Sequence, residues 1–209
     1  MTRKMSSWQP LRRMAKTLAV HPSTAFRWRH RLLAELNTQP KPLLTGLVMA
    51  SEAYVPYSEK GSRRTSGPGS WGARASQTGP TRFRRFIHGK PSCVLVVCAG
   101  NQRALVLTSQ GRPSVIQLKA SFSQLLGTRA KLQAIGLLPY ADVCRHLRVP
   151  YSEAPHSHGA VDRLRGGFYT WLRQMCGIAT RYLPHYLTWF ERIAHTARPQ
   201  PEGGTAPAA

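Results

Sequence analysis

Acidic side chains are scarce in this chain. Its 209 residues include 8 Asp and Glu against 30 Lys and Arg, which gives a formal net charge of +22 at pH 7. A protein this basic repels itself unless it meets a polyanion. Nucleic acid is therefore the expected partner, and an anionic membrane surface is the second. Charge alone is also compatible with a ribosome-associated or simply basic protein.

Long apolar runs and paired cysteines are missing too. The longest apolar run, Cys93–Ala99, has the length of a strand and falls well short of the roughly 18 residues that span a membrane. No apolar segment follows the basic N-terminus, so we expect no signal peptide and a cytoplasmic location. None of the 4 cysteines lies in a C-x-x-C pair, which argues against a zinc ribbon, and we predict no metal site.

Apolar periodicity and turn residues predict the order of the elements. Residues 8–37 read as two helices separated by a break that ends at Ser23, the expected N-cap of the second helix. Strands are expected at 44–57, 91–99, 104–108 and 132–135, and helices at 122–127, 137–147, 160–176 and 180–194. A hairpin-led sheet with later alternation predicts an α/β fold, a ribonuclease-H-like mixed sheet with flanking helices. We divide the chain into a helix-turn-helix region at 1–38, a sheet domain at 44–195 with a loop at 59–90, and a disordered tail at 196–209.

The two N-terminal helices are typical of a helix-turn-helix, because the second is capped and rich in arginine. The major groove of DNA admits one helix, and guanidinium groups match guanine edges and phosphates. Trp28 and Leu32 are expected to pack with Ala25 against the first helix. The residues predicted to contact DNA are Arg12, Arg13, Lys16, Ser23, Arg27, His30 and Arg31. A helical hairpin whose charged face is merely solvated is the alternative.

Four segments carry a resemblance to a known family. The segment 24–33 resembles the helix-turn-helix of bacterial insertion-sequence transposases with a ribonuclease-H-like catalytic domain. Leu44–Tyr54 is similar to that family's first catalytic strand, L-x-G-x-V-E-A-D-E-T-Y, and 58–63 to the segment after it. Residues 177–187 are similar to its G-V-A-T-K-Y-L-P-N-Y-L motif. The zinc ribbon that usually precedes the helix-turn-helix is absent. The resemblance implies double-stranded DNA with terminal inverted repeats as the partner, a nucleoid-associated location and self-association.

The resemblance also implies an acidic triad, Asp-Asp-Glu or Asp-Asp-Asn, that holds two magnesium ions. The family's first Asp falls on Ser51 here. The second falls on Ile135, and no Asp or Glu occurs between residues 60 and 141. The third position falls near Asp162. Glu52 is retained, but successive strand residues point to opposite faces, so we expect it to point away from the metals.

We therefore predict a transposase-family DNA-binding protein whose catalytic triad is lost, with Asp162 and Glu52 as vestigial catalytic candidates and no cofactor. One alternative is an active, Mg²⁺-dependent transposase that uses Glu52, Asp162 and a further acid. Another is a basic nucleic-acid-binding protein without sequence preference, and a third is a remnant that does not fold. The aromatic residues of 182–190 are expected in the core, with stacking on an unpaired base as the alternative. The basic residues of 63–90 either clamp phosphates or are solvated.

Overall fold

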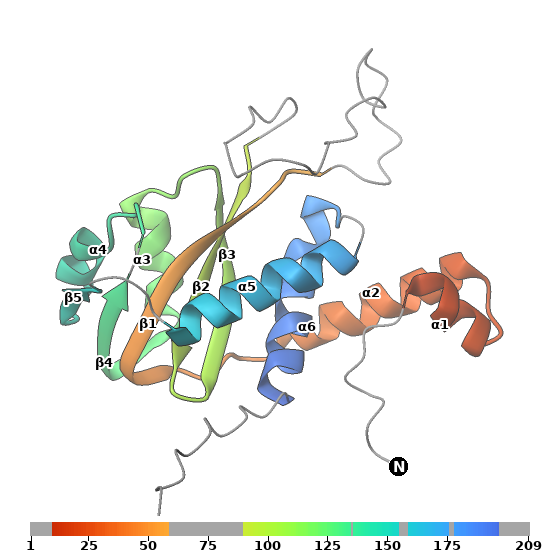
Figure 1. Cartoon of the computed structure of the whole chain (residues 1–209), viewed down its shortest axis with the longest axis horizontal. Helices are drawn as coiled ribbons and strands as arrows, with labels where there is room; N and C mark the ends of the chain where they lie inside the picture. The colour runs from red at the N-terminus through yellow and green to blue at the C-terminus, as the bar shows by residue number, and fades with distance from the viewer. Residues whose placement is uncertain (1–9, 59–89, 135, 155–158, 176–177, 197–209) are drawn as a thin grey trace, which may run out of the picture.

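The computed structural model describes residues 10–58, 90–134, 136–154, 159–175 and 178–196. Within these ranges the chain begins with two helices, continues through a sheet interleaved with helices, and ends on two helical segments (Figure 1). The elements are α1 Leu11–Thr17, α2 Pro22–Thr38, β1 Leu44–Val55, β2 Ser92–Ala99, β3 Gln102–Gln110, α3 Val115–Ser123, β4 Leu126–Ala134, α4 Tyr140–Leu147, β5 Tyr151–Glu153, α5 Gly159–Gln174, the 3-10 helix η1 Thr180–Tyr182, and α6 Leu183–Thr196.

The sheet has five strands in the order β3-β2-β1-β4-β5. Strands β1, β2 and β3 pair antiparallel, whereas β4 lies parallel to β1 and β5 lies parallel to β4. This arrangement confirms the predicted mixed α/β sheet with flanking helices. Helices cover both faces, so every residue of β2 is buried. Within the described residues no helix is both long enough and apolar enough to cross a bilayer.

Two separate cores lie on the two faces of the sheet. One face packs against α3 and α4 through side chains that include Leu118, Phe122 and Val143. The other face packs against α5 and α6 through Phe168 and Leu187. Figure 1 shows α5 crossing the sheet on the side opposite α3 and α4. Alternate residues of one strand feed opposite cores because side chains alternate across a strand.

The sequence prediction missed the true start of α3 and most of β4. Helix α3 begins after Ser114, whose hydroxyl accepts from the amide of Gln117, while the Gln117 side chain accepts from the amide of Ser114. This capping box was readable in the sequence as Ser-x-x-Gln. Strand β4 was harder to find because Arg129 and Lys131 occupy exposed positions between its apolar residues, which leaves no continuous apolar run.

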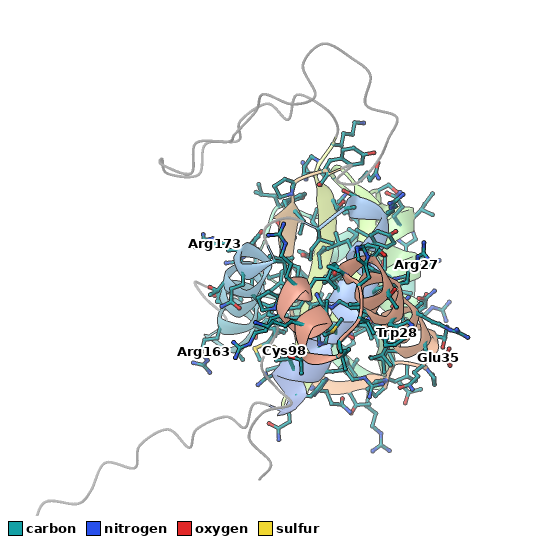
Figure 2. All side chains as sticks on the ribbon, turned by 90° about the vertical axis from the view of Figure 1, so that its right-hand side faces the viewer. Arg27, Trp28, Glu35, Cys98, Arg163 and Arg173 are labelled. Atoms are coloured by element: carbon teal, nitrogen blue, oxygen red, sulfur yellow. The ribbon has the colours of Figure 1, made fainter. Side chains whose placement is uncertain are left out.

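Helices α1 and α2 form an arm that extends from the sheet domain (Figure 1). The C-terminal half of α2 packs on α6, and Leu33 belongs to the same core as Phe168. Figure 2 looks onto the arm and shows Arg27 and Trp28 on one side of the protein, with Arg163 and Arg173 of α5 on the other. Because the C-terminal half of α2 is packed into this core, the arm has a fixed direction relative to the sheet.

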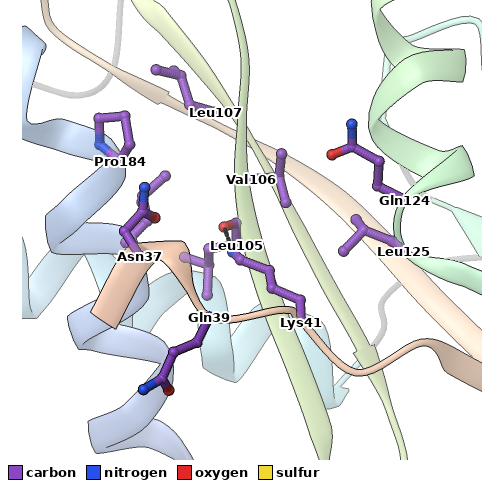
Figure 3. Close-up of a pocket in the computed structure, with 10 residues that line it drawn as sticks. Asn37, Gln39, Lys41, Leu105, Val106, Leu107, Gln124, Leu125 and Pro184 are labelled. Carbon is purple, nitrogen blue, oxygen red and sulfur yellow. Dashed lines mark hydrogen bonds between the residues drawn. The ribbon is translucent and has the colours of Figure 1, made fainter. Parts of the chain in front are cut away.

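The segment between α2 and β1 borders a cavity of about 390 Å³ against the edge of β3 and the first turn of α6 (Figure 3). None of the described residues that line it is Asp, Glu, His or Cys. Its walls therefore supply amide, ammonium and apolar groups but no acid–base pair.

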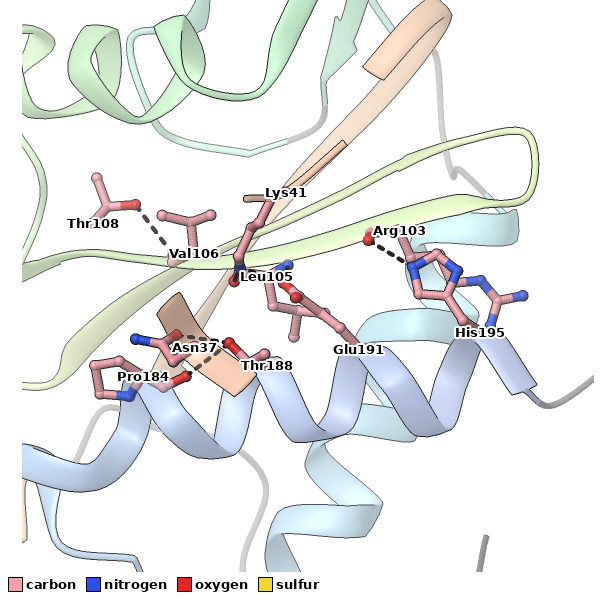
Figure 4. A network of polar contacts seen from close by, with 10 residues as sticks. All are labelled: Asn37, Lys41, Arg103, Leu105, Val106, Thr108, Pro184, Thr188, Glu191 and His195. Atoms are coloured by element: carbon pink, nitrogen blue, oxygen red, sulfur yellow. Dashed lines mark hydrogen bonds and ion pairs between the residues drawn. The ribbon is translucent and has the colours of Figure 1, made fainter. Parts of the chain in front are cut away.

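Beside the cavity, a row of polar contacts fastens this segment to α6 (Figure 4). Thr188 donates to Asn37 Oδ1 at 2.7 Å, and Arg192 donates to the side-chain oxygen of Gln39. Lys41 Nζ lies 2.7 Å from Glu191 Oε1 and donates to the carbonyl of Leu105 at 2.9 Å. We call the contacts of residues 37–41 with 188–192 the clasp. It attaches the arm to α6 at three successive points.

Candidate nucleic-acid interface and candidate catalytic site

Ser51 occupies the first predicted catalytic position, in the middle of the sheet. Its neighbour Ala50 pairs with Ala134, the last residue of β4, so Ser51 lies one residue beyond the final pair of these parallel strands. The Ser51 side chain is fully buried, and its hydroxyl accepts from Arg165 Nη1 at 2.7 Å. Ile135, the second predicted position, lies outside the described residues. The first predicted position thus carries a buried hydroxyl and no carboxylate.

Asp162 lies close to Ser51 through the same arginine. It stands in the first turn of α5, and its Oδ1 is 2.8 Å from Nη2 of Arg165, three residues later. One guanidinium therefore bridges the first and third predicted positions. Ser51 and Asp162, which the family resemblance assigned to two triad positions, thus share one partner, and the sequence analysis did not identify that partner, Arg165. The Asp-x-x-Arg spacing on a helix was the available signal, because residues three apart share a face.

Magnesium does not fit this set of donors. Two metal ions in a strand-transfer site need several hard oxygen ligands, chiefly carboxylates. Asp162 contributes one carboxylate, which is already paired with Arg165, and Ser51 contributes a neutral hydroxyl. No group of three or more His, Cys, Asp or Glu side chains in the described part of the chain is placed to share a metal ion. The space that a cation would need beside Asp162 is taken by a guanidinium.

Glu52 points away from Ser51, as the alternation of strand residues predicts. Its Oε1 accepts from the amide of Leu137 at 2.9 Å, and its Oε2 accepts from the hydroxyl of Tyr140 at 2.8 Å. Burial and the adjacent Glu52 carboxylate raise the pKa of Tyr140. Glu52 therefore fastens the connection between β4 and α4. Glu52, which was predicted only as a vestigial catalytic candidate, has both carboxylate oxygens engaged on the face opposite Asp162.

Gly136 makes room for the Glu52 carboxylate. A Cβ atom built on Gly136 would lie 1.9 Å from Glu52 Oε2, and the residue has a φ of +145°, which side chains disfavour. Glu52, Gly136 and Tyr140 thus meet in one set of contacts. These contacts have a structural role, because they attach the segment that follows Ile135 to β1.

The arm presents basic side chains to solvent. Arg12, Arg13 and Lys16 are exposed on α1, and Arg27 and Arg31 are exposed on α2. Ser23 is exposed as well, but it is not the N-cap that the sequence predicted. Helix α2 begins at Pro22, two residues before the start that a Ser23 cap implies, so the cap is His21, whose Nδ1 accepts from the amide of Ser23. Proline favours the first helical position because its missing amide needs no partner there.

His30 does not face solvent with the arginines, which corrects the prediction that it contacts DNA. Its ring lies 4.0 Å from the ring of Tyr182 and 4.2 Å from that of Phe26, measured between centroids. Both ring nitrogens are buried and lack a hydrogen-bond partner among the described residues. Burial, together with nearby His185, Arg29 and Arg181, lowers the pKa of His30 to about 4. A neutral, enclosed imidazole belongs to the contact between α2 and α6.

Trp28 and Leu32 were expected against the first helix, and this prediction is wrong. Their side chains are 54% and 62% exposed, whereas Ala25 and Leu33 are buried. The covered face instead includes Arg29, whose guanidinium lies 5.5 Å from the ring centre of Trp189 and 3.6 Å from the sulfur of Met14. Helix α6 selects this face, and α6 lies about 150 residues away in sequence, so local periodicity did not identify it.

The aromatic residues of α6 mostly serve the core, as predicted. Tyr186 and Phe190 are buried, and the ring of Trp189 lies 5.7 Å from that of Trp171 in an edge-to-face arrangement. Burial raises the pKa of Tyr186. The buried rings of Tyr186 and Phe190 are therefore not available to stack on a base. The basic residues predicted at 63–85 lie outside the described residues.

Comparisons with known proteins give only distant similarity. No protein family and no curated sequence matches the chain. A chain of the simian T-cell lymphotropic virus intasome in complex with the PP2A regulatory subunit B56 gamma is 13% identical; the match covers 94% of this chain and 76% of that one, with a TM-score of 0.42. A chain of the Mos1 strand transfer complex is 15% identical, with coverage of 90% and 70% and a TM-score of 0.34. A chain of a pre-cleavage Mos1 transpososome is 13% identical, with coverage of 91% and 74% and a TM-score of 0.30.

Proposed function

We propose that this chain is a transposase-family DNA-binding protein that no longer cuts or joins DNA. On this proposal residues 1–38 are a helix-turn-helix region and residues 44–195 a ribonuclease-H-like domain with a degenerate centre. The resemblance of four sequence segments to insertion-sequence transposases supports the family, and the strand order is compatible with it. The proposal extends to a bacterial origin, terminal inverted repeats as the bound site and self-association on paired DNA ends.

The bridge from Ser51 through Arg165 to Asp162 is the observation that carries the loss of catalysis. A guanidinium 2.7 Å from the Ser51 hydroxyl and 2.8 Å from the Asp162 carboxylate supplies fixed positive charge where strand transfer requires removable metal ions. An arginine neither activates water as a metal does nor leaves the site, because it stays charged at every physiological pH. Asp162 and Arg165 thus satisfy each other.

Charge supports the DNA-binding half of the proposal. The net charge of +22 attracts the phosphates of nucleic acid to the protein. The exposed cations of the arm lie on α1 and α2, and the C-terminal half of α2 is packed into the core. Arg27 and Arg31 are four residues apart and therefore share one face of α2. Of the seven residues predicted to contact DNA, the proposal keeps Arg12, Arg13, Lys16, Arg27 and Arg31.

Nicking of supercoiled plasmid by the purified protein, with magnesium or manganese, tests the proposal beside an Asp162→Asn variant. We expect no nicking by either protein, together with retardation of the plasmid that weakens as salt rises. Each phosphate contact contributes about 0.9 to the slope of log K against log salt. An Arg27→Ala/Arg31→Ala double variant should lower that slope by up to about 2, and Arg173→Ala on α5 is the matched control.

Metal-dependent nicking that disappears in Asp162→Asn would contradict the loss of catalysis and support an active enzyme. Equal affinity for duplex DNA and RNA at matched salt would instead support a basic nucleic-acid-binding protein without preference. An unchanged salt slope in the double variant would remove the arm from the interface.

A further inference from the structure

One face of the arm combines exposed apolar and cationic side chains. Successive residues of a helix are separated by about 100° of rotation, which places Arg27, Arg31, Trp28 and Leu32 within one continuous sector of α2. Trp28 is 54% exposed and Leu32 is 62% exposed. Ala25, at the border of this sector next to Leu32, is buried, and Leu33 beyond it is buried in the core that also holds side chains of α5 and α6. The exposed sector is therefore set by packing and does not arise from fraying of the helix.

The composition of this sector indicates the kind of ligand it fits. Two guanidinium groups beside an exposed indole match a ligand that offers phosphates next to flat apolar rings. Nucleobases present such rings only when they are unstacked or unpaired, since duplex DNA hides the base faces. A second copy of the arm fits poorly, because each arm would bring its own arginines against those of its partner.

We propose that the exposed face of α2, formed by Arg27, Trp28, Arg31 and Leu32, binds DNA with unpaired bases. Trp28 stacks on a base, and Arg27 and Arg31 contact the flanking phosphates. This inference rests on the proposed DNA-binding function and adds the form of DNA that is preferred. Glu35 lies on the same side of the arm, toward the C-terminal end of α2 (Figure 2). Glu35 is four residues from Arg31 and shares its face of the helix, so the carboxylate limits the nucleic-acid strand to the part of the sector that precedes it.

The test compares fluorescence anisotropy of labelled oligonucleotides that share one sequence: an intact duplex, the same duplex with a central unpaired bubble, and the single strand. We expect the full-length protein to bind the bubble about tenfold more tightly than the intact duplex, a preference in the range of stacking on one base. Trp28→Ala should abolish this preference, whereas Trp28→Phe should retain most of it. Leu137→Ala, at an apolar residue that is 80% exposed and outside the arm, is the control and should leave it unchanged.

Several outcomes separate this inference from the proposed function. Equal affinity for the duplex and the bubble, unaffected by Trp28→Ala, would overturn the inference while leaving DNA binding intact. No salt-dependent binding to any of the three oligonucleotides would overturn the proposed function itself. Sedimentation without DNA that shows a dimer lost in Trp28→Ala would assign the face to a second copy and overturn the inference. Unchanged thermal unfolding of Trp28→Ala is expected, because the indole is largely outside the core.

Discussion

Four side chains decide the chemistry of the candidate catalytic site, and the contacts of each one show what it does. Ser51 accepts from Arg165, Arg165 pairs with Asp162, and Glu52 contacts the opposite side of the sheet. The family resemblance assigned Ser51 and Asp162 to triad positions, and strand alternation predicted that Glu52 points to the other face. Neither identified Arg165, whose role requires the first turns of α5 to lie over β1.

Gly136→Ala tests the packing of Glu52 at the residue scale. The new Cβ would clash with the Glu52 carboxylate and would stand at a φ of +145°, so we expect a loss of about 2–4 kcal/mol in the free energy of unfolding. Urea denaturation measures this loss. Gly166→Ala in α5 is the control, because no atom lies within 4 Å of its added Cβ, and it should be stabilising by up to about 1 kcal/mol.

A double variant with Glu52→Ala separates the clash from the backbone strain. The cost of Gly136→Ala should fall when Glu52 is truncated, by the share that belongs to the contact. An equal cost in both backgrounds would show that the carboxylate does not occupy the space that Gly136 leaves.

Among the elements, α2 shows how a helix can be predicted correctly and oriented wrongly. Its existence follows from its sequence, but its buried face contains Ala25, Arg29 and Leu33 in place of the expected Trp28 and Leu32. The imidazole of His30 packs against the ring of Tyr182 in η1. Arg29, Arg181 and His185 lie near the same imidazole. The contact between α2 and α6 is therefore formed by aromatic rings with a neutral imidazole among them.

Stability at mildly acidic pH should depend on His30. Its pKa falls from the ordinary 6.5 to about 4 in the folded protein, so below pH 6.5 the unfolded chain binds a proton that the folded chain rejects. The penalty is absent above pH 6.5, grows as pH falls to about 4, and is constant below that. Between pH 7 and 4.5 we expect about 1–2 kcal/mol of lost stability from this group, allowing for screening by solvent.

Denaturation curves measured at several pH values check this expectation. In His30→Phe, which keeps an aromatic ring beside Phe26 and Tyr182, the decline with acid should be smaller than in the wild type. His146→Gln, at an exposed residue of α4, should leave the decline in place. Parallel curves for the wild type and His30→Phe would show that the enclosed imidazole does not resist protonation.

For the whole molecule, the clasp joins the arm to the sheet domain. Lys41 and Glu191 form an ion pair with side-chain exposures of 27% and 9%, and Glu191 also accepts from the amide of Leu105 on the edge of β3. The arm, the edge strand and α6 therefore share one buried polar centre beside a shared apolar core. Such an arrangement favours unfolding of the described parts as one unit.

Glu191→Gln tests this coupling. Removing the carboxylate leaves the ammonium of Lys41 poorly compensated, and we expect the free energy of unfolding to drop by about 2 kcal/mol. Asp142→Asn is the control, because it removes the charge from an exposed ion pair. The side chain of Arg145 is 76% exposed and that of Asp142 is 50% exposed, so the loss should be less than about 0.5 kcal/mol. Far-ultraviolet and near-ultraviolet circular dichroism should report coincident transitions for the wild type. Two resolved transitions would show that the arm unfolds apart from the sheet.

The sequence by itself determined the basic charge, the order of the main strands, and the opposite directions of Ser51 and Glu52. These features follow from composition, turn residues and the twofold alternation of strands, which act over a few residues. Only the tertiary structure decided which face of α2 is covered, that Arg165 bridges Ser51 and Asp162, and that the 37–41 segment is clasped to α6. Each of these depends on residues more than 100 positions apart, whose meeting is set by how the layers pack and not by any local spacing.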